Sequence, residues 1–308
     1  MHLSDILAAR ETSVSFEFFP PKTEKAAQSL YENISHLEEL KPSFVSVTYG
    51  AGGGTRDLTR ELVLKIKRET TIEVMPHLTC VMHTEAEIYD LLEQYAGAGV
   101  ANILALRGDA PGGVNTEFDH GRDAFEFASD LVAFVSRFGK MGGGKPIKDS
   151  RGFGIAVAGF PEGHPGCQNR LEEIDNLKRK MDAGACAIIT QLFFDNRDFY
   201  DFRERCELAG INVPIIAGIM PVTSEGGMRR MAELAAGARF PAPLLRSIAR
   251  CGGDADAVRR VGVHWATEQC RDLLDHGVRG LHLYTLNKST ATREIYATLG
   301  LRDSMALA

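Results

Sequence analysis

The feature that most constrains this chain is a regular alternation between two kinds of segment. Short runs rich in apolar and β-branched residues recur along the sequence, and segments with helical periodicity separate them. The runs cover residues 14–19, 44–50, 72–79, 102–108, 153–160, 187–194, 214–222 and 280–286. Each run is almost continuously apolar, which is typical of parallel strands covered on both faces. Eight strand–helix repeats predict an α/β fold of the (β/α)8 TIM-barrel type, as a single domain over residues 1–308.

The segments between the runs support this prediction. Residues 23–40 carry apolar side chains at helical spacing, and residues 55–69, 84–99 and 170–185 do the same. Gly99 and Gly184 stand where helix C-caps are expected. The main alternative is a doubly wound open sheet, but no G-x-G-x-x-G motif follows the first run, which favours the barrel.

Two connections are unusually long. The glycine-rich part of the first, residues 139–152, is predicted to be a mobile loop. The second lies between the seventh and eighth runs and has room for extra helices. Neither connection requires a second domain.

Charge and composition limit the classes of partner. The formal net charge of −6 over 308 residues does not favour nucleic acid or an anionic membrane surface. The sequence has no run of 18 apolar residues, and residues 1–13 do not have the pattern of a secretory signal. Six cysteines are scattered without C-x-x-C pairs, as in reduced proteins. We therefore expect a cytoplasmic protein with no nucleic-acid or membrane partner, and the sequence leaves a homo-oligomer open.

Polar residues gather at the predicted carboxyl ends of the strands, where TIM barrels carry their chemistry. They are Glu17, Thr48, Tyr49, His77, Arg107, Asp109, Glu162, His164, Gln191, Tyr284 and Asn287. A single Thr or Asn at such a position is usually a turn or cap residue. A set contributed by most of the strands predicts a site at this rim.

Several motifs have competing interpretations. Asp109 is either a turn residue before a proline or a carboxylate held close to a ligand beside Gly108. In "NLKRK", Arg179 and Lys180 belong either to an exposed charged helix or to a phosphate site at the rim. The segment "HLTCVMH" offers two His and one Cys, but a zinc site or zinc-dependent hydrolase needs another ligand or an open water position, so we expect no metal. The glycine-rich stretches lack the order of a phosphate-binding loop.

Nine motifs stand in one order along the chain. They are "SFEFFPPKT", "FVSVTYGAGG", "PHLTC", "LALRGD", "FPEGHP", "NLKRKMDAGA", "ITQLFF", "GIMPV" and "LYTLN". Together they closely resemble the methylenetetrahydrofolate reductase family in its single-domain bacterial form, over nearly the whole chain. The resemblance implies a FAD-dependent TIM barrel of one-carbon and methionine metabolism. Such an enzyme reduces 5,10-methylenetetrahydrofolate to 5-methyltetrahydrofolate, with NADH or NADPH as electron donor.

The resemblance also implies roles for individual residues. Glu17 matches the catalytic acid, and Asp109 matches the carboxylate near the flavin ring and the folate pterin. The positions expected to contact the folate substrate are Gln191, Tyr284 and Lys288. The positions expected to contact FAD are Thr48, His77, Arg107, Gly108, Asp109, Phe160, His164, Asn176, Arg179 and Lys180.

The implied chemistry accounts for these residue types. The closed ring of methylenetetrahydrofolate accepts hydride poorly, and protonating a ring nitrogen opens it to a reactive iminium cation. Glu17 is flanked by Phe16, Phe18 and Phe19, so we expect partial desolvation, which favours a protonated carboxyl group. Acid catalysis of this kind contributes ~10²–10⁴-fold. Asp109 would stay ionised and oppose the cationic charge on the folate.

Three positions depart from the family pattern. Phe160 replaces a common Tyr, which removes a hydroxyl contact to the flavin, and Lys288 replaces an Arg, which keeps the charge without the bidentate fork. Relatives commonly carry a dinucleotide-stacking Phe after "MPV", whereas this chain has "TSEGG" with Glu225 near that position. One alternative is therefore a relative that uses NAD(P)H weakly and mainly oxidises methyltetrahydrofolate with another electron partner. Another is a flavin- or folate-binding protein without turnover.

Overall fold

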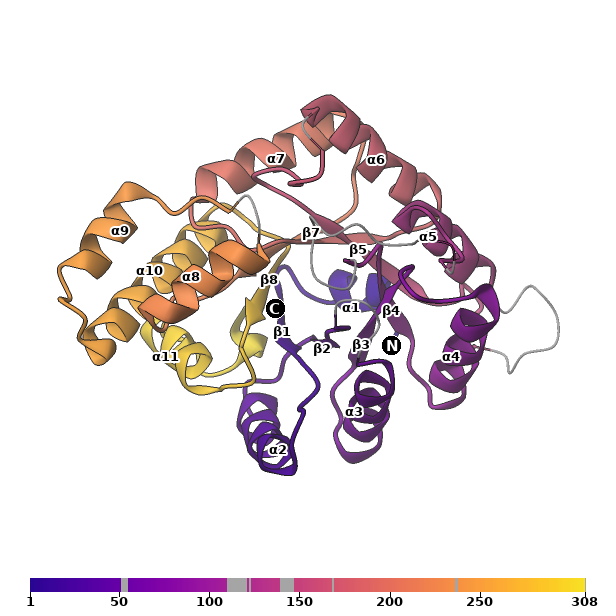
Figure 1. Cartoon of the computed structure of the whole chain (residues 1–308), viewed down its shortest axis with the longest axis horizontal. Helices are drawn as coiled ribbons and strands as arrows, with labels where there is room; N and C mark the ends of the chain where they lie inside the picture. Colours follow the sequence, from indigo (N-terminus) through magenta and orange to yellow (C-terminus); the bar gives the residue numbers. More distant parts are fainter. Residues whose placement is uncertain are drawn as a thin grey trace.

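A computed structural model describes residues 1–50, 55–109, 121, 123–138, 147–167, 169–235 and 238–307. Its parallel strands pair in chain order, and the last pairs with the first to close a barrel. The strands are β1 (Ser13–Phe18), β2 (Phe44–Val47), β3 (Val74–Thr79), β4 (Asn102–Leu106), β5 (Gly154–Gly159), β6 (Ala187–Thr190), β7 (Ile215–Ile219) and β8 (Gly280–Tyr284). The predicted (β/α)8 barrel is confirmed (Figure 1).

Each predicted apolar run coincides with one strand, although β1 begins one residue before its run, and several runs extend beyond the strand at its carboxyl end. The clearest cases are the sixth and seventh runs, where pairing stops at Thr190 and Ile219. The apolar residues that follow, such as Phe194 and Val222, are buried in a separate cluster beside the barrel. Their apolar character therefore reflects packing against helices and not strand pairing.

Helices surround the strands, as Figure 1 shows. They are α1 (Leu3–Ala8), α2 (Glu24–Glu38), α3 (Arg56–Glu69), α4 (Glu85–Gly97), α5 (Ala128–Arg137), α6 (Arg170–Asp182), α7 (Asn196–Leu208), α8 (Glu225–Leu234), α9 (Ala242–Ala249), α10 (Ala255–Asp275), α11 (Thr290–Thr298) and the short 3-10 helix η3 (Ser304–Leu307). The four helices expected from periodicity correspond to α2, α3, α4 and α6. Gly99 and Gly184 follow α4 and α6 with φ of +79° and +121°, which confirms the predicted caps.

The extra helices predicted between the last two strands are α8, α9 and α10, which lie together at the left of Figure 1. They bury their own apolar cluster, which includes Leu192, Phe194 and Met231. Trp265 of α10 contacts this cluster, and its Nε1 donates a hydrogen bond to the carbonyl of Phe194 at 3.0 Å. The three helices thus extend the barrel rim beside β6 and β7.

Helix α1 closes the opposite end of the barrel. Leu3, Ile6 and Leu7 pack against interior side chains from the amino-terminal ends of the strands. At Gly154, the first residue of β5, a Cβ atom would lie 2.8 Å from the backbone nitrogen of Leu3, so the close approach requires glycine. The sequence did not predict this helix because six residues are too short to establish periodicity. The plug leaves the carboxyl-terminal end of the barrel as the place for a ligand.

Most of the predicted mobile loop at 139–152, namely residues 139–146, lies outside the described residues. Arg151, in its described part, pairs with Asp149 and with Asp5 of α1. Among the described residues, no helix combines the length and apolar character needed to cross a membrane.

Candidate functional site

Glu17 is the next-to-last residue of β1 and projects into the mouth of the barrel. Its side chain is 19% exposed, and its Oε2 lies 3.4 Å from Nε2 of His77 and 3.6 Å from Nε2 of His282. Side chains alternate along a strand, so Phe16 and Phe18 project to the opposite face, where both join the core between strands and helices. The expectation that the phenylalanines desolvate Glu17 is therefore corrected, because histidines inside the barrel surround its carboxylate.

His282 of β8 is the main site residue that the sequence did not reveal. Its side chain is 1% exposed, its Nδ1 lies 2.7 Å from Oγ of Ser15, and its Nε2 lies 3.3 Å from Oγ of Ser46. The register pairs Ser15 with His282 and Glu17 with Tyr284, so all four side chains face the barrel interior. The only sequence signal for His282 was its position as a polar residue within the apolar run "GLHLYTL".

His77 of β3 completes this group, although the resemblance implied a FAD contact for it. Burial lowers the pKa of His77 to about 4, so the imidazole is neutral at pH 7. Its Nε2 is buried and makes no hydrogen bond to any described residue. A buried donor or acceptor without a partner is unfavourable, so this atom is available to a ligand entering the mouth of the barrel.

Two other predicted residues flank Glu17. Thr48 follows β2, and its backbone N–H donates to the carbonyl of Phe18 at 2.8 Å, which fixes the end of β1 from the β2 side. Tyr284 ends β8, and its hydroxyl donates to the carbonyl of Thr190 at 2.8 Å across the barrel. Burial raises the pKa of Tyr284 well above its usual value, so the phenol keeps its proton.

The loop after β4 contributes Arg107, Gly108 and Asp109. Gly108 has φ of +85°, and a Cβ there would lie 2.8 Å from Cβ of Thr79. Only glycine fits this backbone conformation without strain. Arg107 and Asp109, on either side of it, are exposed. The tight turn therefore presents one cation and one carboxylate to the rim.

The loop after β5 holds His164 in a defined orientation. The backbone N–H of Gly166 donates to Nδ1 of His164 at 3.0 Å, so the neutral ring carries its proton on Nε2 and can donate to a ligand from there. Desolvation lowers the pKa of His164, which favours this neutral form. Phe160 lies edge-on to the ring, with centroids 4.7 Å apart.

Glu173 and Arg170 of α6 hold this loop through a hydrogen bond and an ion pair. Oε1 of the nearly buried Glu173 accepts the backbone N–H of His164 at 3.0 Å, and Oε2 pairs with Arg170 at 3.1 Å. The guanidinium of Arg170 occupies the space above Gly163, where a Cβ would lie 1.1 Å from Nη1. Gly163 has φ of +94°. The loop conformation therefore depends on glycine at this position.

The charged end of α6 lies near the same loop. Lys180 is within electrostatic range of His164, and so are Arg107 and Asp109. Burial lowers the pKa of Lys180 to about 8, and its Nζ donates to the carbonyl of Ala158 at 3.4 Å. Within the described residues, Arg107, Arg179 and Lys180 form no ion pair with a carboxylate. Arg107 and Lys180 therefore bring positive charge to the His164 loop, where Glu173 offsets part of the charge of Lys180, and Arg179 is exposed on α6.

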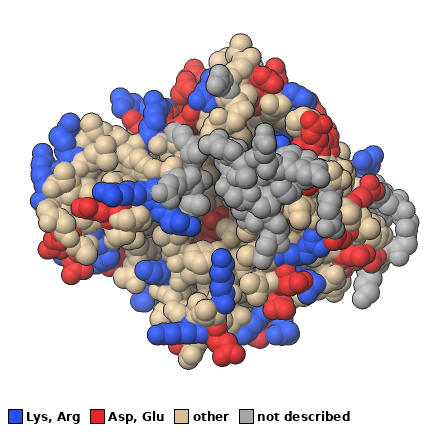
Figure 2. Space-filling view, viewed as in Figure 1, with Lys and Arg blue, Asp and Glu red and all other residues tan. Residues whose placement is uncertain are grey.

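The remaining predicted residues are more separate. Gln191 follows β6, and its Oε1 accepts the backbone N–H of Leu192 at 2.9 Å. Asn176 is half-buried on α6, and Lys288 is exposed after β8. Figure 2 shows basic and acidic side chains interspersed over this face, with acidic atoms also visible near its centre. None of these three side chains has a contact that assigns it a ligand.

In the segment "HLTCVMH", which was considered as a zinc site, His83 makes contacts with other protein groups. Nε2 of His83 lies 2.8 Å from the hydroxyl of Tyr49, and its Nδ1 lies 2.9 Å from the carbonyl of Val81. Burial raises the pKa of Cys80 to about 12, which disfavours the thiolate that binds zinc. Among the described residues, no three His, Cys, Asp or Glu side chains are arranged to hold a metal ion.

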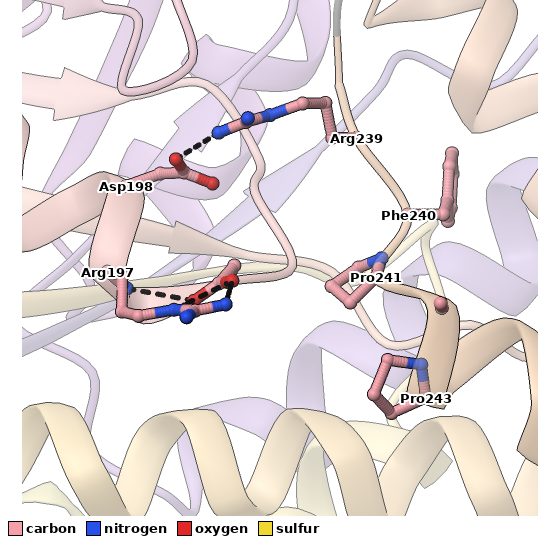
Figure 3. Close-up of a pocket in the computed structure, with 8 residues that line it drawn as sticks. Arg197, Asp198, Arg239, Phe240, Pro241 and Pro243 are labelled. Carbon is pink, nitrogen blue, oxygen red and sulfur yellow. Dashed lines mark hydrogen bonds and ion pairs between the residues drawn. The ribbon is translucent and has the colours of Figure 1, made fainter.

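A cavity of about 560 Å³ lies elsewhere, between the start of α7 and the segment before α9 (Figure 3). Its charged side chains pair locally, Arg197 with Asp195 and Arg239 with Asp198. The backbone N–H of Arg239 also donates to Oε1 of Glu162 at 2.8 Å, which ties this segment to the loop after β5. Because these charges satisfy one another, we place the candidate site at Glu17 and not in this cavity.

Comparison with known proteins connects this geometry to a family. The family model for methylenetetrahydrofolate reductase matches residues 2–300. The chain is 39% identical to 5,10-methylenetetrahydrofolate reductase of Escherichia coli K12 over 295 residues, which cover 96% of this chain and 93% of the relative. The chain belongs to the methylenetetrahydrofolate reductase family.

Other members of the methylenetetrahydrofolate reductase family are longer. The chain is 39% identical to methylenetetrahydrofolate reductase (NADH) 1 of Arabidopsis thaliana over 303 residues, or 95% of this chain and 49% of the relative. It thus spans about half the length of such plant members. A Clostridium thermocellum protein solved with two copies of 5-methyl-5,6,7,8-tetrahydrofolic acid aligns with a TM-score of 0.61 at 17% identity, over 98% of both chains. That likeness shows the shared fold.

Several of the residues that the family resemblance assigns to FAD have chemistry suited to such a group. FAD carries a diphosphate, and Arg107 and Lys180, which lie within electrostatic range of His164, supply cationic charge. His164 offers Nε2 as a neutral donor, and the buried Nε2 of His77 lacks a partner. The donor set therefore fits a flavin dinucleotide better than a metal ion.

Proposed function

We propose that the protein reduces 5,10-methylenetetrahydrofolate to 5-methyltetrahydrofolate, with Glu17 as the acid. The observation that carries this proposal is the position of Glu17. Its half-buried carboxyl group lies at the ligand-accessible mouth of the barrel, within 3.6 Å of the Nε2 atoms of His77 and His282. Membership of the methylenetetrahydrofolate reductase family supplies the substrate class.

The surroundings of Glu17 suit a group that delivers a proton. His77 is neutral at pH 7 because burial lowers its pKa to about 4, so it does not hold the carboxyl group ionised as a cation would. His282 lies between Glu17 and the hydroxyl groups of Ser15 and Ser46. His77 and His282 therefore flank the carboxyl group, which is 19% exposed. A proton delivered from Glu17 to a folate ring nitrogen would open the ring to the iminium cation.

The other rim residues would bind and orient the ligands. FAD, when bound and reduced by an electron donor such as NAD(P)H, would supply the hydride. Arg107, Arg179 and Lys180 would hold its diphosphate, and His164 would donate a hydrogen bond from Nε2. Thr48, His77, Gly108, Asn176 and Phe160 would complete the flavin site. Gln191, Tyr284 and Lys288 would contact the folate, with Asp109 opposing the cationic charge that develops on it. All six cysteines are free, which supports a reducing, cytoplasmic location.

One observation favours a second candidate function. Glu225 occupies the first turn of α8, where its charge is favourable to the helix. The family resemblance puts it near the position where relatives commonly carry a dinucleotide-stacking Phe. A carboxylate there would repel the phosphates of NADH. The second candidate is therefore an enzyme that mainly oxidises 5-methyltetrahydrofolate and passes electrons to another partner.

Anaerobic assays of the purified protein with FAD would test both candidates. We expect NADH or NADPH to bleach the bound flavin, and methylenetetrahydrofolate to restore its colour while 5-methyltetrahydrofolate forms. Bleaching only by 5-methyltetrahydrofolate, with an artificial acceptor needed for turnover, would favour the second candidate. Bound flavin with no turnover in either direction would contradict both candidates and favour a binding protein without catalysis.

A further inference from the structure

The end of β1 is held by side chains from the segment after β8. Backbone register between these strands stops at the pair Glu17 and Tyr284. Beyond that pair, the side-chain amide of Asn287 contacts the backbone of Phe19 twice. Its Oδ1 accepts the N–H of Phe19 at 2.9 Å, and its Nδ2 donates to the carbonyl of Phe19 at 2.8 Å. This is the pair of hydrogen bonds that the backbone of a neighbouring strand would make.

Thr285 connects this amide contact to Glu17 itself. Its hydroxyl donates to the carbonyl of Glu17 at 2.7 Å and accepts the backbone N–H of Asn287 at 3.2 Å. The carbonyl and amide groups from Glu17 to Phe19 are therefore fixed from the β8 side, while Thr48 fixes Phe18 from the β2 side. The next residue is Pro20, which cannot donate a backbone hydrogen bond, so strand pairing cannot continue beyond this point.

The backbone of this segment is strained. Leu286 and Asn287 have φ of +51° and +58°, in the left-handed region that residues other than glycine rarely adopt. Asn tolerates this region better than most residues, but Leu does not. Such conformations persist where the surrounding contacts determine them, and they are concentrated at functional sites. Here the conformation directs the Asn287 amide at β1.

We propose that Asn287 is a positioning residue, which holds the end of β1 so that the Glu17 carboxyl group stays at a fixed place in the barrel mouth. The inference rests on the proposed function of Glu17 as the acid. The Phe19 side chain is 42% exposed, whereas the preceding Phe18 is fully buried. On the β8 side, the amide contact therefore takes the place of the backbone pairing that stops at Glu17.

The test uses Asn287→Gly and Asn287→Asp in the full chain with FAD bound. Glycine accepts the left-handed conformation and removes both amide contacts, so it separates the contacts from the strain. Aspartate keeps the acceptor for the Phe19 N–H and loses the donor, so it should be intermediate. Asn212→Gly, an exposed Asn before β7 at the other end of the barrel, is the matched control.

Hydrogen exchange at the end of β1 and the rates of the two flavin half-reactions decide the outcome. In Asn287→Gly, we expect faster hydrogen exchange in a peptide covering residues 15–19, and at least about tenfold slower flavin reoxidation by methylenetetrahydrofolate. Flavin reduction should stay unchanged, whereas a general loss of structure would slow both half-reactions and lower Tm. The pH profile of reoxidation should also change, because the proton donor is displaced.

Unchanged hydrogen exchange would overturn the proposal that Asn287 holds the end of β1. Faster exchange with normal reoxidation would overturn its role in positioning Glu17, and so would equal slowing of both half-reactions. A wild-type protein without turnover in the presence of methylenetetrahydrofolate would instead overturn the proposed function on which the inference rests. The exchange measurement does not depend on turnover, so these failures are distinguishable.

Discussion

Nε2 of His77 lies 3.4 Å from Oε2 of Glu17, and burial lowers the pKa of this histidine to about 4. The imidazole is therefore a neutral neighbour of the proposed acid at physiological pH. The lowered pKa of His77 also makes the stability of the fold depend on pH, because a histidine in the unfolded chain has its ordinary pKa of 6.5. The unfolded chain binds a proton in this range that the folded protein does not.

The first prediction concerns the pH dependence of stability. Because the folded pKa of His77 is depressed, this residue lowers the stability of the fold as pH falls from 6.5 towards 4. Between pH 7 and pH 5, linkage gives a loss of roughly 2 kcal/mol for a pKa of about 4. Urea unfolding of wild type and His77→Gln at both pH values measures it. An equal loss in both proteins would contradict the account.

The second prediction concerns the His164 loop. Gly163→Ala places a Cβ into the Arg170 guanidinium and strains a backbone with φ of +94°. We expect FAD to bind at least about tenfold more weakly, which corresponds to about 1.4 kcal/mol. Adding Arg170→Ala should restore only part of the affinity, because the backbone strain remains. Flavin titration followed by fluorescence measures this. Gly226→Ala, where a Cβ has open space, is the control, and equal affinities in both would refute the assignment.

The third prediction concerns Tyr284, which spans the barrel from β8 to the carbonyl of Thr190. Tyr284→Phe leaves that carbonyl without this donor, and we expect a loss of about 1 kcal/mol in the free energy of unfolding. Tyr31→Phe is the control, since its hydroxyl makes no hydrogen bond within the described residues. Denaturant unfolding compares the two variants. If Tyr284→Phe lost no more free energy of unfolding than Tyr31→Phe, the hydrogen bond across the barrel would have no measurable role.

The fold was predictable from sequence because burial on both faces gives each strand a nearly continuous apolar run, and each of the eight runs coincides with one strand. Rim positions such as Glu17 and His164 were predictable because TIM barrels carry their functional polar residues at the carboxyl ends of the strands. Three features were not accessible. The neighbours of Glu17 depend on barrel register, which places His282 beside it. The α1 plug is too short for a periodic signal, and the Asn287 contact requires a backbone conformation that sequence alone does not specify.

The fourth prediction concerns the start of α4. The Arg56 guanidinium and the N–H and hydroxyl of Thr84 contact Glu87, and they lower the pKa of its carboxyl group to about 2. A depressed carboxyl pKa gives stability that is present above pH 4.5 and lost as pH falls towards 2. We expect Glu87→Gln to cost about 1 kcal/mol at pH 7. Urea unfolding would measure it against Asp90→Asn on the same helix. Equal stability of the two variants would rule out this contribution.

The most direct test of the central claim is stopped-flow measurement of both half-reactions in Glu17→Gln. Glutamine keeps the shape of the side chain and cannot supply the proton. We expect reoxidation of reduced flavin by methylenetetrahydrofolate to slow at least ~100-fold, while reduction of the flavin by NAD(P)H stays within about twofold of wild type. Glu32→Gln, at an exposed position of α2, should behave as wild type in both. Normal reoxidation in Glu17→Gln would contradict the assignment of Glu17 as the acid.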